Sequence, residues 1–342
     1  MKVLLANLLI SIVFGSFSRV IIEIENEGQQ ALPVRHVRST PALNLAKLTQ
    51  RAIASELDKL NEGESELADA GSIQSLDLKD DISLQVPLES RGDAVYVGTI
   101  FIGAPQSQPA RVVFDTGSEY LAVTSALCDD SKAGNYKFKV YDAANNDFIK
   151  KDVPNRCSTL SYNMHQSNTG KILSRSSSKL AYGSANLQGF IWEDQACLQQ
   201  LSGNATSQQM KEDKCAPFEF LALYKADGLE DNTDGILGLS PHKNEEKRKL
   251  HYLWALKDNG IISRAMVSFS IASNDMLDGS YALFGGVNST QILGGTGGLK
   301  SFPSFKNFLG TWALEGQKVF YDGKPMEGTE QSYPAIIDTG TS

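Results

Sequence analysis

VVFDTGS, residues 112–118, is the stretch that decides the fold, because a closely similar stretch, AIIDTGT, occurs again at residues 335–341. Each copy places a run of apolar residues, typical of a buried strand, directly before Asp-Thr-Gly and a hydroxyl residue directly after it. A single Asp-Thr-Gly is a common turn, and average composition predicts about 0.06 copies by chance in a chain of this length. Two copies with the same flanks, so far apart, indicate a duplicated lobe.

The two aspartates, Asp115 and Asp338, suit a hydrolytic chemistry that needs neither a metal nor a covalent nucleophile. Two carboxylates held side by side cannot both ionise easily, so the pair shares a proton. One can act as a base toward a bound water while the other donates to a peptide carbonyl. Glycine lets the backbone approach a carboxylate closely and offer its N–H. We therefore expect the catalytic pair to be supported by Thr116, Gly117, Ser118, Thr339, Gly340 and Thr341.

Composition and charge exclude several classes of function. The chain has 342 residues, of which 41% are hydrophobic and 21% charged, as in a soluble globular protein large enough for two domains. The formal net charge of -8 argues against nucleic acid or an anionic membrane as the main partner. The four histidines are scattered and the four cysteines form no CxxC pair, so we expect no metal and no organic cofactor.

The first 85 residues differ in texture from the rest. Residues 1–18 carry one lysine, an apolar run and then small residues, which predicts a secretory signal peptide. The alternative is a membrane anchor, but about 20 apolar residues are needed to cross a bilayer. Residues 19–85 are basic at first and acidic later, and we expect a prosegment that is removed at low pH, with a charged linker as the alternative. Together these features predict a zymogen in the secretory pathway, either secreted or delivered to a lysosome or vacuole.

From about residue 86 the sequence turns into short β-rich runs separated by turn residues, which predicts an all-β fold. The clearest runs are residues 94–102, 111–114, 189–192, 265–271 and 281–284. Residues 244–260 instead have the apolar spacing of a helix that stops at Gly260. A Gly-rich run at residues 294–298 lacks the Lys-Ser/Thr ending of a phosphate loop, so a surface hairpin is the expected structure.

The cysteines and two sequons agree with export. In a secreted chain, four cysteines predict two disulfides, for which three pairings are possible. The sequence also contains two N-glycosylation sequons, which begin at Asn204 and Asn288.

Taken together, residues 93–342 resemble the pepsin and cathepsin D family of aspartic proteases. The resemblance rests on both Asp-Thr-Gly copies and on three further stretches, residues 96–103, 234–239 and 279–286. It implies a bilobal, all-β, pepsin-like acid protease fold, with an N-terminal lobe at residues 86–265 and the start of a C-terminal lobe at residues 266–342.

The same resemblance assigns a flap to residues 182–189. It implies that Tyr182, Gly183 and Ser184 contact the substrate, whereas the alternative is an ordinary glycine-containing hairpin. Ala122 stands where most members carry a tryptophan that partners the flap tyrosine, so we expect a wider pocket. Ala185 replaces a common flap glycine, which would stiffen the tip. Residues 128–182 are longer than usual and receive no strand assignment.

The resemblance also bears on the disulfides and on function. It favours pairing Cys128 with Cys157, and Cys197 with Cys215 across a polar insertion. It implies a monomeric aspartic endopeptidase that acts on polypeptides. The rival interpretations are a binding protein that has lost catalysis on this fold and a secreted glycoprotein with coincidental motifs. Because no residue follows Ser342 in this sequence, we expect an incomplete second lobe and an inactive fragment.

Overall fold

The described structure covers the body of the chain but omits several predicted sites. The computed structural model describes residues 18–23, 83–92, 94–129, 139–142, 147–150, 157–174, 176–181, 185–201, 214–241, 250–272, 279–292, 302, 310–316, 319–321, 324–328 and 332–340. Residues 1–17, most of the predicted prosegment, the flap residues 182–184, Asn204, the run at 294–298 and Thr341 lie outside these ranges.

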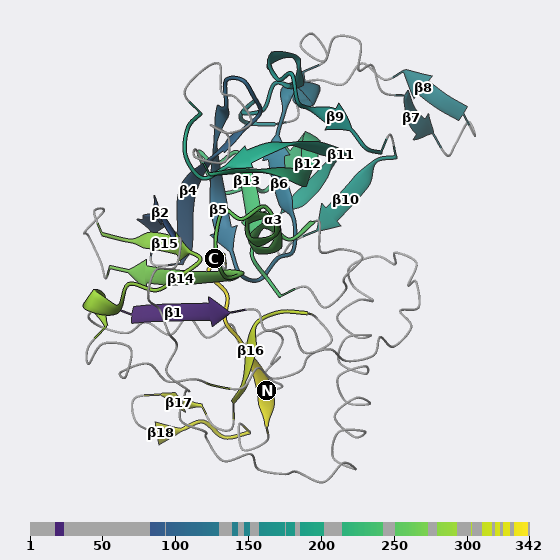
Figure 1. Cartoon of the computed structure of the whole chain (residues 1–342). Coiled ribbons are helices and arrows are strands. Elements are labelled where there is room, and N and C mark those ends of the chain that lie inside the picture. Colours follow the sequence, from purple (N-terminus) through teal and green to yellow (C-terminus); the bar gives the residue numbers. More distant parts are fainter. Residues whose placement is uncertain are drawn as a thin grey trace, which may run out of the picture.

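A nine-stranded sheet forms the larger part of the described structure (Figure 1). Its strand order is β10-β11-β12-β6-β13-β5-β4-β3, and β9 pairs with β11. The strands are β3 (Glu89–Arg91), β4 (Val95–Ile102), β5 (Gln108–Asp115), β6 (Leu121–Thr124), β9 (Lys171–Ile172), β10 (Ser178–Ala181), β11 (Asn186–Cys197), β12 (Cys215–Asp227) and β13 (Gly235–Gly238). Because β11 also pairs with β4, the sheet closes on itself.

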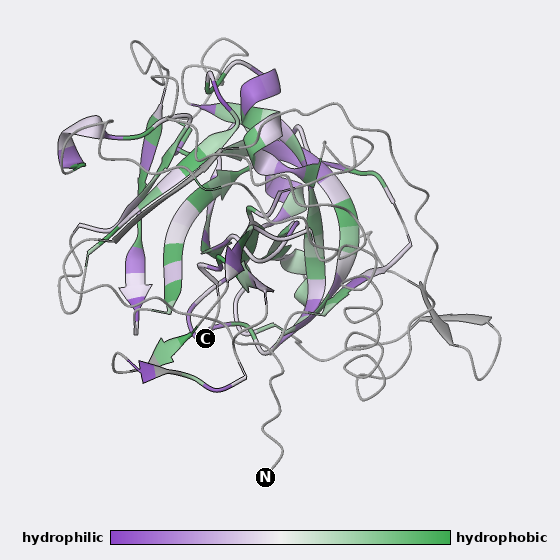
Figure 2. Cartoon of the chain, turned by 90° about the horizontal axis from the view of Figure 1, so that it is seen from below, coloured by the Kyte–Doolittle hydropathy of each residue, from purple (hydrophilic) through white to green (hydrophobic). Residues whose placement is uncertain are grey.

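Alternation along the strands explains why this sheet is buried on two faces. Successive side chains of a strand point to opposite faces. In β5, Val112 and Phe114 belong to the main hydrophobic cluster, whereas Val113 belongs to a second cluster that also contains Ala122 and Leu187. Hydrophobic residues accordingly run along the strands in the middle of the molecule in Figure 2. The apolar run before Asp115 is thus held from both sides.

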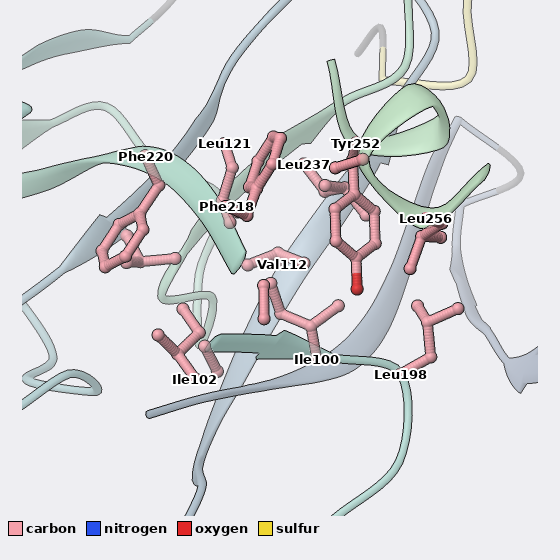
Figure 3. Packing of buried hydrophobic residues seen from close by; sticks show 14 of the residues in the cluster. Ile100, Ile102, Val112, Leu121, Leu198, Phe218, Phe220, Leu237, Tyr252 and Leu256 are labelled. Carbon is pink, nitrogen blue, oxygen red and sulfur yellow. The ribbon is translucent and has the colours of Figure 1, made fainter. Parts of the chain in front are cut away.

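The helix α3 (Tyr252–Asp258) closes one end of the main cluster. Tyr252 and Leu256 are completely buried, and Figure 3 shows Tyr252 pointing from the helix toward Ile100 and Leu198. Gly260 follows the helix with a φ of 70°, a left-handed conformation that suits glycine after a helix end.

A second, four-stranded sheet has the order β1-β14-β15-β2. Its strands are β1 (Ser18–Glu23), β2 (Leu84–Pro87), β14 (Met266–Ile271) and β15 (Tyr281–Phe284). Val267 and Phe269 of β14, and Ala282 and Phe284 of β15, belong to the same main cluster as the larger sheet. The rings of Phe114 and Phe284 lie edge to face with centroids 6.0 Å apart, so the two sheets share one core.

The remaining elements are short. Three antiparallel pairs join β7 (Lys139–Asp142) to β8 (Asp147–Lys150), β16 (Ala313–Gly316) to β19 (Tyr333–Ile336), and β17 (Phe320–Tyr321) to β18 (Lys324–Pro325). Single 3-10 turns occur at η1 (Ala126–Cys128), η2 (Met164–Gln166) and η4 (Ser289–Gln291). Within the described ranges, no helix has the length and apolar character needed to cross a membrane.

The observed elements confirm the predicted all-β fold. All five predicted strands are present. Of the predicted helix at residues 244–260, the described residues 250–260 are α-helical from Tyr252 to Asp258, and residues 244–249 lie outside the description. Strands β7 to β10 fall in the stretch that received no assignment. These strands have only two to four residues each, too few to produce a clear alternation.

The structure joins Cys128 to Cys157 and Cys197 to Cys215, the two pairs that the family resemblance favoured. Cys197 and Cys215 face each other across the β11–β12 ladder. Cys128 ends η1, and its bond ties that turn to the start of the described segment 157–174.

Candidate active site

The candidate site lies where β5 ends. Asp115 is the last residue of β5, and β13 runs parallel beside it with Gly238 opposite Asp115. Its side chain is 8% exposed, since the strand that carries it is packed on both faces. The backbone N–H of Gly117 donates to Asp115 Oδ1 at 2.8 Å. The chain thus turns back over its own carboxylate.

The second copy repeats the turn, although its strand β19 (Tyr333–Ile336) is only half-buried. Asp338 follows β19, and the N–H of Gly340 donates to Asp338 Oδ1 at 2.9 Å. In Figure 1 the C-terminal part of the chain rises from β16 and β19 to meet the end of β5. The two Asp-Thr-Gly copies, far apart in sequence, therefore meet at one place.

The threonines join the two loops to each other. Thr116 N–H donates to Thr339 Oγ1 at 3.1 Å, and Thr339 N–H donates to Thr116 Oγ1 at 3.0 Å. Each hydroxyl also donates to the carbonyl of the residue before the opposite aspartate, Thr116 to Ile337 O at 2.8 Å and Thr339 to Phe114 O at 2.5 Å. Because both threonines are buried, these bonds form out of water.

The glycines bring each backbone against the opposite carboxylate. A Cβ built on Gly117 would lie 2.5 Å from Asp338 Oδ2, and one built on Gly340 would lie 2.5 Å from the Cγ of Asp115. No side chain fits at such distances, so both positions require glycine. The sequence predicted that glycine would allow the backbone to approach a carboxylate closely. In the structure, each glycine approaches the aspartate of the other copy.

The environment of Asp115 favours its neutral form. Burial, the negative charge of Asp338 and a hydrogen bond with Asp338 together raise the pKa of Asp115 from 3.8 to about 7, with burial the largest cause. The Ser118 hydroxyl and the Gly117 N–H act in the opposite direction and lower this pKa. Below neutral pH the carboxyl of Asp115 therefore favours its protonated form.

Ala122 stands where a tryptophan was expected, and its absence predicted a wider pocket. Ala122 is completely buried and belongs to the same cluster as Ala185 and Leu187. Because residues 182–184 lie outside the described residues, the wider pocket stays a prediction.

Other predicted residues fall in or around this site as follows. Thr116, Ser118, Thr339 and Gly340 lie at the meeting point of the two loops, while Thr341 and the flap residues Tyr182, Gly183 and Ser184 lie outside the described residues. Among the residues that the structure describes, no group of three His, Cys, Asp or Glu side chains could hold a metal ion.

Sequence reasoning missed Trp312, which holds the loop from behind. Leu239 N–H donates to Asp115 O at 2.7 Å, and Trp312 Nε1 donates to Leu239 O at 2.9 Å. The family resemblance of residues 234–239 pointed to this region, but nothing local to Trp312 indicated its partner.

Comparison with known proteins agrees with the geometry. The profile of the eukaryotic aspartyl protease family matches residues 95–342. Pregnancy-associated glycoprotein 2 of Sus scrofa is 31% identical over 257 residues, covering 75% of this chain and 51% of the relative. Pepsin-3 of Oryctolagus cuniculus is 28% identical over 258 residues, with 75% and 55% covered.

Pepsin A of Sus scrofa is 27% identical over 256 residues, covering 75% of this chain and 56% of the relative. The chain thus spans about half the length of the curated relatives it matches. The match over residues 95–342 rules out coincidental motifs. Two facing Asp-Thr-Gly loops and the profile match lead to one conclusion, that this chain belongs to the eukaryotic aspartyl protease family.

Proposed function

We propose that the protein is an aspartic endopeptidase that hydrolyses peptide bonds through a water held by Asp115 and Asp338. The observation that carries the proposal is the reciprocal arrangement of the two loops, which places both carboxylates against each other. The raised pKa of Asp115 supports it, because a pair that keeps one proton near neutral pH can act as both acid and base.

In the proposed reaction the ionised member of the pair removes a proton from the water, whose oxygen attacks the peptide carbonyl carbon. The protonated member gives its proton to the carbonyl oxygen. The tetrahedral intermediate then collapses as its C–N bond breaks and a proton passes to the leaving amine. The substrates are polypeptides in extended conformation, which Tyr182, Gly183 and Ser184 would contact, and the reaction needs no metal or organic cofactor.

We further propose that the protein works after removal of an N-terminal segment. Residues 1–18 would direct it to the secretory pathway, residues 19–85 would form the prosegment, and residues 86–265 and 266–342 would belong to the two lobes. The pairing of β1 with β14 supports a docked N-terminal segment. Acid would trigger release, after which a monomer would act outside the cell or in a lysosome or vacuole, glycosylated at Asn204 and Asn288. Full activity at pH 7 with this segment intact would contradict the zymogen proposal.

Replacement of one carboxyl by an amide tests the catalytic proposal. In the full-length protein, Asp115→Asn should reduce hydrolysis of a quenched fluorescent peptide by several orders of magnitude, because the pair loses its acid–base function. Asp231→Asn, at an exposed turn, is the control and should hydrolyse the peptide normally. Near-normal turnover by Asp115→Asn would refute the assignment.

A further inference from the structure

Residues 238–240, which are the end of β13 and the two residues after it, hold the loop that begins at Asp115. Three consecutive N–H groups donate to that loop: Gly238 to Tyr120 O at 3.0 Å, Leu239 to Asp115 O at 2.7 Å and Ser240 to Ser118 O at 2.9 Å. Any displacement of residues 238–240 would therefore move the backbone from Asp115 to Tyr120.

The carbonyl groups of the same segment are held by two side chains. Trp312 Nε1 donates to Leu239 O at 2.9 Å, and His251 Nε2 lies 2.5 Å from Ser240 O. A carbonyl oxygen only accepts hydrogen bonds, so the Nε2 of His251 carries the proton. The segment is thus fixed from one side by its N–H groups and from the other by these two side chains.

The side chain of His251 has no evident role in its own helix. His251 is the N-cap residue of α3, but its side chain forms no capping hydrogen bond. It is completely buried, and the helix behind it is anchored by the buried Tyr252, Leu253 and Leu256. A rigidly anchored imidazole thus faces the carbonyl of the segment that holds the active-site loop.

We propose that His251 is a positioning residue for the carboxyl pair, which acts through its hydrogen bond to the Ser240 carbonyl and the backbone bonds from residues 238–240 to the Asp115 loop. This inference rests on the proposed function. Trp312 supports the same segment by donating a hydrogen bond to the carbonyl of Leu239, next to that of Ser240. A histidine that merely fills the core would contribute to stability alone, and an experiment can separate the two roles.

The test uses two amide variants of the full-length protein. Glutamine places an N–H near the position of Nε2, so His251→Gln retains the bond to Ser240 O, whereas the shorter His251→Asn does not reach it. Tyr252→Phe is the matched control, since it changes a buried side chain of the same helix that takes no part in the chain of hydrogen bonds. The readouts are the pKa of Asp115, followed by carbon-13 NMR of its carboxyl group, and kcat and KM for a peptide.

We expect His251→Asn to lower the Asp115 pKa by about one unit, because a loosened loop admits water and separates the carboxyls. Its kcat should fall about 10- to 100-fold with little change in KM. His251→Gln and Tyr252→Phe should keep the wild-type values. Should His251→Asn fail to fold, Trp312→Phe takes its place, and its Asp115 pKa should fall likewise.

The inference is overturned if the variant that loses the bond has only a lower melting temperature, with the Asp115 pKa unchanged. It is also overturned if His251→Gln behaves as His251→Asn does. A wild-type protein without peptidase activity would instead refute the proposed function, while the NMR titration would still decide the role of His251.

Discussion

Thr116 and Thr339 exchange hydrogen bonds, each N–H donating to the hydroxyl of the other at 3.1 and 3.0 Å. The two loops are thereby related by an approximate two-fold exchange of identical contacts. This relationship ties the position of one carboxylate to that of the other, because the aspartate precedes the threonine directly in both copies.

Thr116→Val should disrupt this relationship without changing the shape of the side chain. It leaves the Thr339 N–H and the Ile337 carbonyl without their partner, which costs about 1–3 kcal/mol in the free energy of unfolding. We expect kcat/KM to fall at least about 10-fold, as the carboxyls separate. Urea denaturation and peptide hydrolysis measure the two effects.

Thr124→Val is the matched control for this prediction. Thr124 is equally buried, but its hydroxyl contacts Thr159 and Ser161 and takes no part in the contact between the two loops. It should lose stability and keep its kcat/KM. Equal kinetic losses in the two valine variants would show that the exchange between Thr116 and Thr339 has no special part in the site.

Gly340→Ala adds only one methyl group, yet we expect it to reduce activity strongly. The added methyl group would meet the carboxyl of Asp115 at 2.5 Å, so the two loops must move apart. Gly286→Ala is the control, because its methyl group meets only the side chain of Ser83 at 3.2 Å. We expect a loss of at least about 100-fold in kcat for Gly340→Ala, and a kcat like that of the control would contradict the geometry.

Asp115→Asn should make the folded protein more stable near neutral pH. Folded Asp115 holds its proton up to a pKa of about 7, whereas an unfolded chain releases it near 3.8. Between these values the unfolded state binds fewer protons, so wild-type stability falls as the pH rises. Asparagine does not ionise, and the variant should gain about 2–4 kcal/mol over wild type between pH 4 and pH 7.

Urea denaturation of wild type and Asp115→Asn at several pH values measures this difference. Asp231→Asn provides the baseline for an exposed aspartate. If the stabilities of wild type and Asp115→Asn run parallel from pH 4 to pH 7, the raised pKa is wrong.

Removal of the hydroxyl group from two core tyrosines, Tyr162 and Tyr252, should affect the stability of the protein differently. Tyr162 donates to the buried Asp194 Oδ2 at 2.7 Å, so Tyr162→Phe should cost about 1.5–3 kcal/mol of stability. The buried Tyr252 hydroxyl forms no hydrogen bond in the described structure, and burial raises its pKa above the usual value. Tyr252→Phe should therefore be neutral or stabilising by up to about 1 kcal/mol. Thermal unfolding of both variants gives the comparison, and a large loss in Tyr252→Phe would refute it.

Local pattern was sufficient for the class of fold and for the identity of the carboxyl pair. An apolar run before Asp-Thr-Gly predicts a strand that ends in a tight turn, and this information lies within seven residues. The end of β5 is buried as expected, whereas β19 is half-buried. The short strands β9 and β10 escaped prediction because the strand with which both pair is β11, which lies further along the chain. Sequence alone likewise could not give the packing of Ala122, since its neighbours come from other strands.

Sequence alone therefore identified two aspartates, two motifs and an all-β chain, because each depends on residues that are contiguous. It did not identify which glycine lies over which carboxylate, how far the pKa of Asp115 rises, or that His251 faces Ser240. Those properties depend on distances between segments that only packing brings together. Burial and charge act through space, and no periodicity in the sequence records them.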